Sequence, residues 1–261
     1  MTQPLAPVKR PTRLITIPGS HYCEKARWAL SRLPNSWVEE PHMPPFYQFA
    51  IQRLGGQSVP VLVAGTDTLT NSEEILRWTD KNVSEQSKLY PANPNDRQQI
   101  EALVASFDSV LGPAVRQWCY FYILDRPRLV QPPWCQGVPW FERLLFPVLY
   151  RPIRSRIVQG YTINPEAAEA AYDRICKTFE AVEALLSDGR TYLVGEHFSA
   201  ADLTFAALAS PVIMPEGYGM ALPDFNQLPS QMTAKIQAFR ETPAGKFVLR
   251  LYERHRRTKP G

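Results

Sequence analysis

The stretch that decides the fold runs Leu14-Ile-Thr-Ile-Pro-Gly-Ser-His-Tyr-Cys-Glu-Lys-Ala-Arg-Trp-Ala-Leu30. Its β-branched and apolar beginning predicts a strand, and the apolar residues that follow at helical spacing predict a helix over residues 20–33. Ser20 and Cys23 therefore fall on the first turn of that helix. Free backbone N–H groups and the positive end of the helix dipole favour negative charge there, so the turn is suited to hold an anion or a thiolate.

Composition limits the class of protein. The chain has 261 residues, 44% of them hydrophobic, which is enough to form the cores of two modest domains. Its net charge of +4, from 29 basic and 25 acidic residues, is spread along the chain and does not indicate a nucleic-acid partner. No stretch approaches the ~20 apolar residues of a membrane-spanning helix, and residues 1–10 lack the apolar centre of a signal peptide. We therefore expect a cytoplasmic protein.

The cysteines point to the same compartment. They share no metal-ligand spacing, and in a chain of this size they do not form a disulfide framework; they are Cys23, Cys119, Cys135 and Cys176. We expect reduced thiols and no metal site.

Residues 12–82 alternate between strand-like and helix-like patterns. After the first strand and helix, residues 37–43 predict a second strand. The apolar runs 59–63 and 68–70 flank a turn that contains Gly65, which is typical of a hairpin. A helix is expected over residues 71–81. This order predicts an α/β domain.

The rest of the chain is predominantly helical by pattern. Residues 88–95 hold prolines and asparagines without periodicity and predict a linker. Helical spacing then predicts long helices over 96–124 and 166–186. We therefore divide the chain into an α/β domain at residues 1–85, a linker at 86–95 and an all-helical domain at 96–261.

An insertion at about residues 125–162 interrupts the helical pattern. Its first part, residues 126–140, is rich in proline and tryptophan and predicts a loop. An amphipathic stretch follows, which Pro147 and Pro152 should kink or divide. Its apolar stripe consists of Phe141, Leu144, Leu145, Val148, Leu149, Ile153 and Ile157. Three interpretations remain open: an extra helix on the core, a lid over an apolar pocket, or a helix on a membrane surface.

A helix start near residue 200 has a structural role. In Phe198-Ser-Ala-Ala-Asp202-Leu203, Ser199 is expected to cap the helix while the Asp202 carboxylate accepts from the Ser199 N–H. We assign neither residue to catalysis.

Three separate parts of the α/β domain carry the candidate chemistry. Pro60, which follows Val59, is expected to hold a cis peptide that turns the Val59 backbone toward a ligand. Asn71 and Ser72 begin a helix and offer N–H groups and a hydroxyl to a carboxylate. With Ser20 as the third part, the arrangement predicts a clamp for an extended, anionic peptide.

Four motifs in register resemble the cytosolic glutathione transferase superfamily. They are Ser20-His-Tyr-Cys-Glu-Lys-Ala-Arg-Trp-Ala-Leu30, Ser58-Val-Pro-Val-Leu62, Leu69-Thr-Asn-Ser-Glu-Glu-Ile75 and Tyr192-Leu-Val-Gly-Glu-His-Phe-Ser-Ala-Ala-Asp202. The resemblance implies a thioredoxin-like N-terminal domain, an all-helical C-terminal domain, glutathione as co-substrate and a homodimer. The insertion lies outside the resemblance.

The resemblance also implies roles for individual residues. Ser20 takes the position of the family's activating serine, and its hydroxyl donates a hydrogen bond to the glutathione sulfur, which favours the thiolate. Val59 with Pro60 holds the cysteinyl backbone, and Ser72 binds the γ-glutamyl carboxylate. Gln57 or Ser58 stands where relatives offer a Lys or Gln. Asn71 replaces the Glu, Gln or Asp that many relatives carry, so the contact with the ligand's amino group is weaker.

The expected reaction is attack of the thiolate on a small apolar electrophile, which is a detoxification chemistry. Aromatic candidates for the wall of the second-substrate site are Tyr22, Trp118, Phe121 and Tyr122. Two alternatives remain: a glutathione-dependent thiol transferase or reductase in which Cys23 forms a mixed disulfide, and a non-catalytic ligand-binding protein of the same fold.

Overall fold

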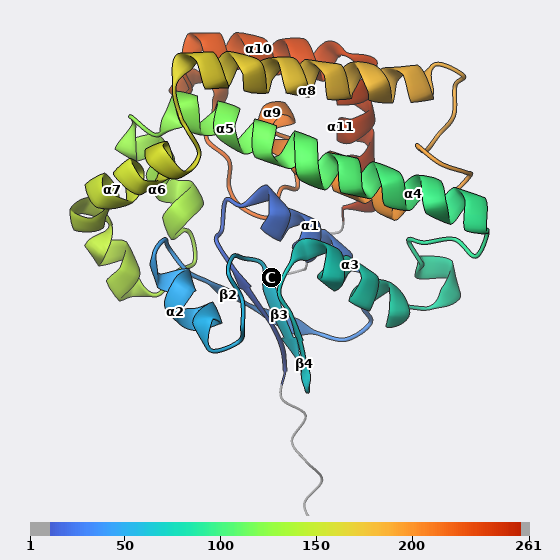
Figure 1. Cartoon of the computed structure of the whole chain (residues 1–261), viewed down its shortest axis with the longest axis horizontal. Helices are drawn as coiled ribbons and strands as arrows, with labels where there is room; N and C mark the ends of the chain where they lie inside the picture. The colour runs from blue at the N-terminus through green and yellow to red at the C-terminus, as the bar shows by residue number, and fades with distance from the viewer. Residues whose placement is uncertain (1–10, 257–261) are drawn as a thin grey trace, which may run out of the picture.

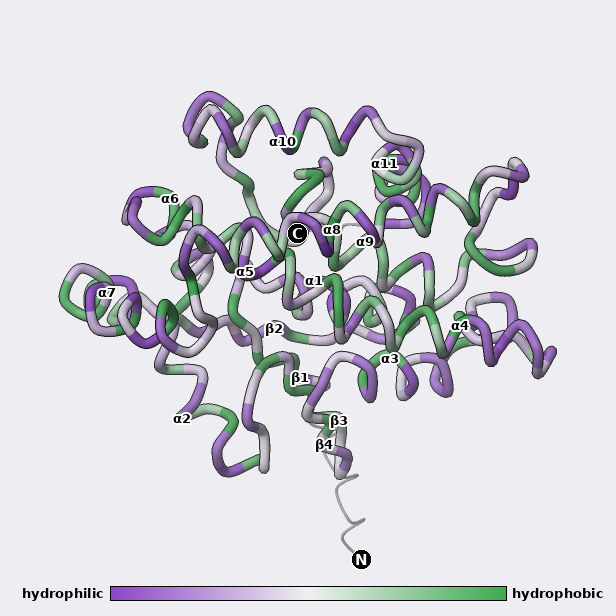
Figure 2. Tube along the Cα trace, turned by 45° about the horizontal axis from the view of Figure 1, so that its top comes forward, coloured by the Kyte–Doolittle hydropathy of each residue, from purple (hydrophilic) through white to green (hydrophobic). Residues whose placement is uncertain are grey.

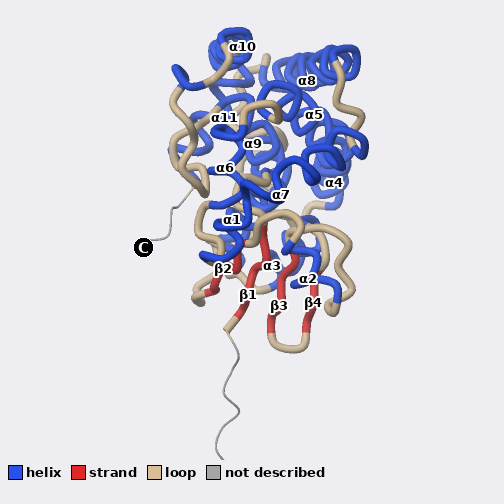
Figure 3. The backbone as a smooth tube through the Cα atoms, turned by 90° about the vertical axis from the view of Figure 1, so that its left-hand side faces the viewer, coloured by secondary structure: helices blue, strands red, loops and turns tan. Residues whose placement is uncertain are grey.

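The computed structural model describes residues 11–256, and a four-stranded sheet forms its N-terminal part. The strands are β1 (Thr12–Thr16), β2 (Trp37–Pro41), β3 (Val61–Ala64) and β4 (Asp67–Leu69), in the spatial order β2-β1-β3-β4. β1 pairs parallel with β2 and antiparallel with β3, and β3 and β4 form the expected hairpin. The sheet and the large helical part occupy opposite ends of the molecule (Figure 3). The expectations for residues 1–10 lie outside the described residues.

Helix α1 (His21–Leu30) joins the two parts of the molecule. Ala26 and Leu30 pack on the sheet against Leu14 and Leu62. Trp28, on the other side of α1, belongs to the core of the helical part. The helix ends at Leu30 rather than at residue 33, because a turn begins at Ser31. With α2 (Phe46–Gln52) and α3 (Ser72–Lys81) it completes a thioredoxin-like domain, which confirms the predicted fold class.

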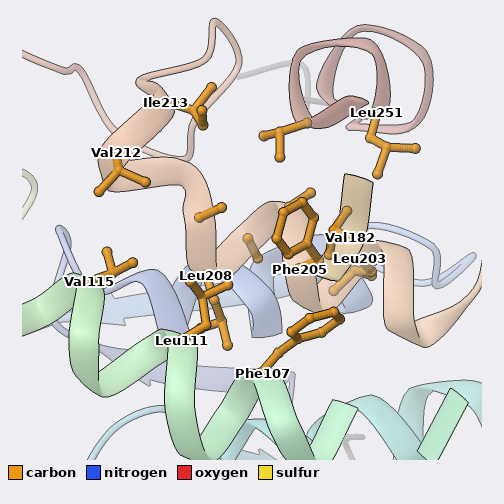
Figure 4. Packing of buried hydrophobic residues seen from close by; sticks show 14 of the residues in the cluster. Phe107, Leu111, Val115, Val182, Leu203, Phe205, Leu208, Val212, Ile213 and Leu251 are labelled. Atoms are coloured by element: carbon orange, nitrogen blue, oxygen red, sulfur yellow. The ribbon is translucent and has the colours of Figure 1, made fainter. Parts of the chain in front are cut away.

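The helical domain is built around one apolar helix. α9 (Ala200–Ile213) is buried along nearly its whole length. Figure 4 shows its Phe205 and Leu208 side chains near Phe107 and Leu111. The surrounding helices, seen in Figure 1, are α4 (Pro94–Ser106), α5 (Gly112–Ile123), α8 (Pro165–Leu186), α10 (Ser230–Glu241) and α11 (Pro243–His255). The start of α9 confirms the predicted capping box, since Ser199 N donates to the Asp202 carboxylate at 2.7 Å.

The predicted long helix over 96–124 carries a local irregularity. α4 continues into a π-helical turn, Phe107–Leu111, and then directly into α5. Pro113 lacks the N–H that would continue the i→i−5 pattern to the Asp108 carbonyl. The Tyr22 hydroxyl donates to that carbonyl instead, at 2.7 Å. Gly112 is required here because a Cβ at this position would overlap the Tyr22 ring. The irregular turn therefore holds the start of α1 against the helical domain.

The insertion is more helical than the sequence predicts. The expected loop over residues 126–140 contains α6 (Pro127–Cys135), so that expectation is wrong. Pro127 occupies the first turn, where its missing N–H costs nothing. Pro147 and Pro152 do not divide α7 (Trp140–Gly160), which is continuous. α6 and α7 lie at the edge of the molecule, on the same side as α2 (Figure 1).

α7 buries the C-terminal part of the predicted stripe, where Leu149, Ile153 and Ile157 pack inward, but not its N-terminal part. Phe146, Tyr150 and Ile153 enter a small core with Trp134. In contrast, the N-terminal members of the stripe face outward, as Val148 at 73% exposure illustrates. The exposed apolar side chains of α7 are Trp140, Phe141, Leu144, Leu145 and Val148. Figure 2 shows apolar and polar residues alternating along α7. The prediction failed because apolar residues occupy both faces of the first half of this helix.

Within residues 11–256 the helices are too short or too polar for any of them to cross a bilayer.

Candidate active site

A cavity of about 500 Å³ lies between the thioredoxin-like and helical domains. This volume is typical of a small-molecule site. One wall is polar and comes from the starts of α1 and α3 and from the turn before β3; it consists of Gly19, Ser20, Ser58, Val59, Pro60, Asn71, Ser72 and Glu73. The opposite wall is mainly apolar and includes Val115, Cys119, Tyr120, Ile123, Leu129, Trp134, Met214 and Leu222.

Ser20 is the N-cap of α1 and lines the cavity. Its backbone is extended, and its Oγ accepts from Cys23 N at 3.3 Å. This bond uses a lone pair of the hydroxyl, so its proton can be donated either to the Cys23 sulfur or to an acceptor in the cavity. An acceptor in the cavity, such as a thiolate, can therefore receive a hydrogen bond from Ser20.

The turn before Ser20 is held from several directions. Gly19 N donates to the Pro133 carbonyl of α6 at 2.7 Å, and Tyr218 donates to the Gly19 carbonyl at 3.1 Å. Arg27 donates to the Pro18 carbonyl at 2.9 Å. A Cβ at residue 19 would overlap Pro133, so glycine is needed for this close approach. The insertion thus helps to position the Ser20 turn, a role that the sequence does not indicate.

The other predicted parts of the clamp reach the same wall. The Val59–Pro60 peptide is cis, as expected. Asn71 caps α3 by accepting from Glu74 N at 2.9 Å, and Ser72 is buried beside it. Ser58 lines the cavity, whereas the lining does not include Gln57.

Cys23 is separated from the cavity. Its side chain has 0% exposure, and the cavity lining does not include it. Burial raises the pKa of the Cys23 thiol to about 11, against the weaker opposing effect of Arg27. The thiol is therefore protonated at neutral pH and is a poor nucleophile.

The structure divides the four aromatic candidates for the second-substrate wall. Tyr22 lines the cavity, and burial raises its pKa to about 12. Trp118, Phe121 and Tyr122 are not brought to the cavity. Trp118 instead packs in the helical core, with its ring 5.0 Å from that of Tyr122.

The face of α5 that points away from Trp118 and Tyr122 forms part of the cavity wall. Arg116, Tyr120 and Ile123 follow one another at helical spacing on that face, and all three line the cavity. Sequence reasoning missed them because α5 is rich in aromatic residues on both faces. Charged residues that it also missed are Glu73 and Asp108. Glu73 directly follows the predicted Ser72 in the first turn of α3, whereas no spacing signal marks Asp108, which tertiary packing brings to the cavity.

The first residue of α1 is a buried histidine. His21 Nε2 lies 3.0 Å from the Gly112 carbonyl. Burial, aided by the positive charge of Arg116, lowers the pKa of His21 to about 3. His21 is therefore neutral across the physiological range and holds α1 to α5 as a hydrogen-bond donor.

No group of three or more His, Cys, Asp or Glu side chains placed to hold a metal ion occurs between residues 11 and 256.

Comparison with known families identifies the class of protein. Residues 14–87 match the glutathione S-transferase N-terminal domain, and residues 165–225 match the glutathione S-transferase C-terminal domain. The chain belongs to the cytosolic glutathione transferase superfamily. The interval between the two matches contains α6 and α7.

Solved structures share the fold at low sequence identity. The beta-etherase LigF from Sphingobium sp. strain SYK-6 is 17% identical with a TM-score of 0.59, over 92% of this chain and 99% of that one. A possible glutathione S-transferase from Rhodopseudomonas palustris is 17% identical with a TM-score of 0.57, over 94% and 95%. A glutathione transferase from Populus trichocarpa is 16% identical with a TM-score of 0.54, over 93% and 99%. Comparison with curated proteins gives no match.

Proposed function

We propose that this protein is a glutathione transferase that conjugates the glutathione thiolate to small apolar electrophiles. The observation that carries the proposal is the position of Ser20, whose hydroxyl caps α1 and lines the cavity between a polar and an apolar wall. Such an enzyme needs both a group that stabilises a thiolate and an apolar space next to it.

The polar wall suits glutathione in an extended conformation. The backbone of Val59, beside cis-Pro60, pairs with the cysteinyl backbone of the tripeptide. Ser72 and the N–H groups at the start of α3 bind the γ-glutamyl carboxylate, which the positive end of the helix dipole also favours. Ser58 is the better placed of the two residues offered for a further contact, because it lines the cavity and Gln57 does not.

Ser20 then acts on the sulfur. Its hydroxyl donates a hydrogen bond to the thiolate, and the start of the α1 dipole adds positive potential. Both effects favour the ionised sulfur over the thiol. The thiolate attacks an electrophilic carbon held by the apolar wall, the new C–S bond forms, and the leaving group departs with its electron pair. Ser20 remains unmodified throughout.

The thiol-transfer alternative finds less support. It needs an accessible, ionised Cys23, and this thiol is buried with a raised pKa. The carrier alternative differs from the transferase only in that Ser20 does not activate the glutathione thiol.

We also propose a homodimer, because glutathione transferases are commonly dimeric, and a cytoplasmic location, in keeping with four free cysteines.

The test is the ultraviolet absorbance of the glutathione thiolate, titrated with pH in the presence of excess protein. We expect the wild type to lower the pKa of the bound thiol from about 8.5 to about 7, as one good hydrogen bond to a charged group allows. Ser20→Gly keeps helix capping almost intact but removes the hydroxyl, so the thiol pKa should rise most of the way to its free value, with only the effect of the helix dipole remaining. Ser20→Thr should retain part of the effect.

Two controls separate the alternatives. Thr242 also caps a helix, α11, so Thr242→Gly should have the same small effect on stability as Ser20→Gly and leave the thiol titration unchanged. Cys23→Ala should leave conjugation within about twofold, as for a residue outside the reaction. Loss of activity in Cys23→Ala would favour thiol transfer, and an unshifted thiol in the wild type would favour a carrier.

A further inference from the structure

Charged groups are rare in the cavity, and most of them are neutralised. Asp108 accepts from the buried Lys25 at 2.6 Å. Glu73 accepts from Arg77 at 3.0 Å. The third charged lining residue is Arg116. The ion pairs found among residues 11–256 do not include it, and residues 1–10 and 257–261 contain no Asp or Glu.

Arg116 is held in place by aromatic rings rather than by a carboxylate. Its guanidinium lies over the Tyr161 ring, 4.2 Å from the ring centre. Tyr161 in turn stacks with Tyr120, with ring centres 6.1 Å apart. All three residues line the cavity. Stacking leaves the edge of a guanidinium, with its N–H donors, free to bind a partner in the plane.

Arg116 lies close to the position that we propose for the reacting sulfur. It follows Gly112 by one helical turn, and Gly112 contacts His21 in the first turn of α1. The charge of Arg116 also acts on His21 and Tyr22, the two residues that follow Ser20. The guanidinium is therefore on the apolar wall but near the proposed thiolate position.

We propose that the second substrate is an aromatic electrophile that carries an anionic oxygen, a carboxylate or phenolate, and that Arg116 binds this oxygen. This inference rests on the proposed function. Arg116 is only half-buried, and because none of the ion pairs among residues 11–256 includes it, a ligand in the cavity can supply the matching negative charge. The planar donor edge of arginine matches a carboxylate in two parallel hydrogen bonds. Tyr120, which lines the cavity beside Arg116, provides ring surface against which an aromatic ring can pack.

The test uses a pair of ligands that differ by one carboxylate group. Chlorodinitrobenzene and its ring carboxylate, chlorodinitrobenzoate, both react by addition of the thiolate to the ring carbon and loss of chloride with its electron pair. Their glutathione conjugates contain the same tripeptide and differ by one carboxylate. Calorimetric binding of the two purified conjugates therefore measures the contribution of Arg116 without requiring catalysis.

We expect the wild type to bind the carboxylated conjugate about 10- to 100-fold more tightly, the range for a hydrogen bond to a charged group. Arg116→Gln should abolish this preference and leave binding of the neutral conjugate and of glutathione within about threefold. Arg116→Lys should restore part of it, since it keeps the charge but not the two-point geometry. Arg151 is exposed on α7 and outside the cavity, so Arg151→Gln is the matched control for loss of one positive charge.

Other outcomes would contradict either the role of Arg116 or the proposed function, and the two cases can be told apart. Equal binding of the two conjugates by the wild type contradicts it, and this result needs no variant to fold. Equal loss of both conjugates and of glutathione in Arg116→Gln would assign the guanidinium to glutathione itself. Tight, charge-dependent conjugate binding without turnover of either electrophile would instead contradict the proposed function and leave the role of Arg116 standing.

Discussion

The two walls of the cavity are constructed in different ways. The wall from the thioredoxin-like domain presents backbone groups and hydroxyls at the starts of α1 and α3, so its geometry follows from local chain conformation. The wall from the helical domain presents the side chains of α5 and the insertion, including one guanidinium. The first wall suits one ligand of constant shape, and the second determines which other molecule can react with it. Substitutions on the two walls should therefore have different consequences.

The largest predicted effect is a loss of stability when the buried face of α5 is substituted, and substitution of its cavity face should instead change electrophile preference. Trp118 is buried in the helical core, so Trp118→Ala should lower the free energy of unfolding by about 3–5 kcal/mol. The relative rates with different electrophiles should stay unchanged. Tyr120→Ala, on the cavity face, should cost less stability and change those relative rates. Urea unfolding and a panel of electrophiles measure both properties, and an altered electrophile preference in Trp118→Ala would place the second-substrate wall on the wrong face.

A similar contrast applies within the insertion. Phe146 is buried against Trp134, whereas Val148, two residues later, is 73% exposed. Phe146→Ala should destabilise the protein by about 3 kcal/mol or more, and Val148→Ala should change stability by less than about 0.5 kcal/mol. Thermal and urea unfolding of the two variants check this. Comparable losses would mean that the outward face of α7 is covered in solution.

The last effect depends on pH and concerns His21, which joins the two walls. Its pKa is about 3 in the folded protein, below the value of about 6.5 expected when unfolded. The unfolded state therefore binds more protons between these values, and stability should fall as the pH is lowered from 7 toward 4. The contribution of this residue to the slope is at most about 1.4 kcal/mol per pH unit.

The matched variants for that measurement are His21→Gln and His197→Gln. His21→Gln should flatten the pH dependence of urea unfolding, because it removes the group that titrates only in the unfolded state. His197 is exposed on the surface, so His197→Gln should leave the dependence unchanged. An unaltered slope in His21→Gln would show that folding does not lower the pKa of His21.

The polar wall was predictable from sequence because short-range rules determine it. A few neighbouring residues determine the conformation at each of three places: the serine before a helix, the Val-Pro step before a strand and the Asn-Ser helix start. The order of the other strands and helices of the thioredoxin-like domain was predictable for the same reason, but the sequence pattern did not indicate α2.

The apolar wall was not predictable because it depends on which face of a helix meets which neighbour. α5 carries rings on both faces, and α7 carries apolar residues on both sides of its first half, so periodicity alone selects neither face. The helix α6 was missed because its prolines resemble a loop. The unpaired charge of Arg116 is visible only once the surrounding chain is in place.

The most direct measurement is a crystal structure with glutathione bound. The account predicts the glutathione sulfur within ~3.5 Å of Ser20 Oγ, at hydrogen-bond distance, with the tripeptide backbone on Val59 and its γ-glutamyl carboxylate at Ser72. Cys23 should remain a free thiol in the interior. A mixed disulfide between glutathione and Cys23, or a tripeptide bound along α5 with its sulfur away from Ser20, would contradict the account.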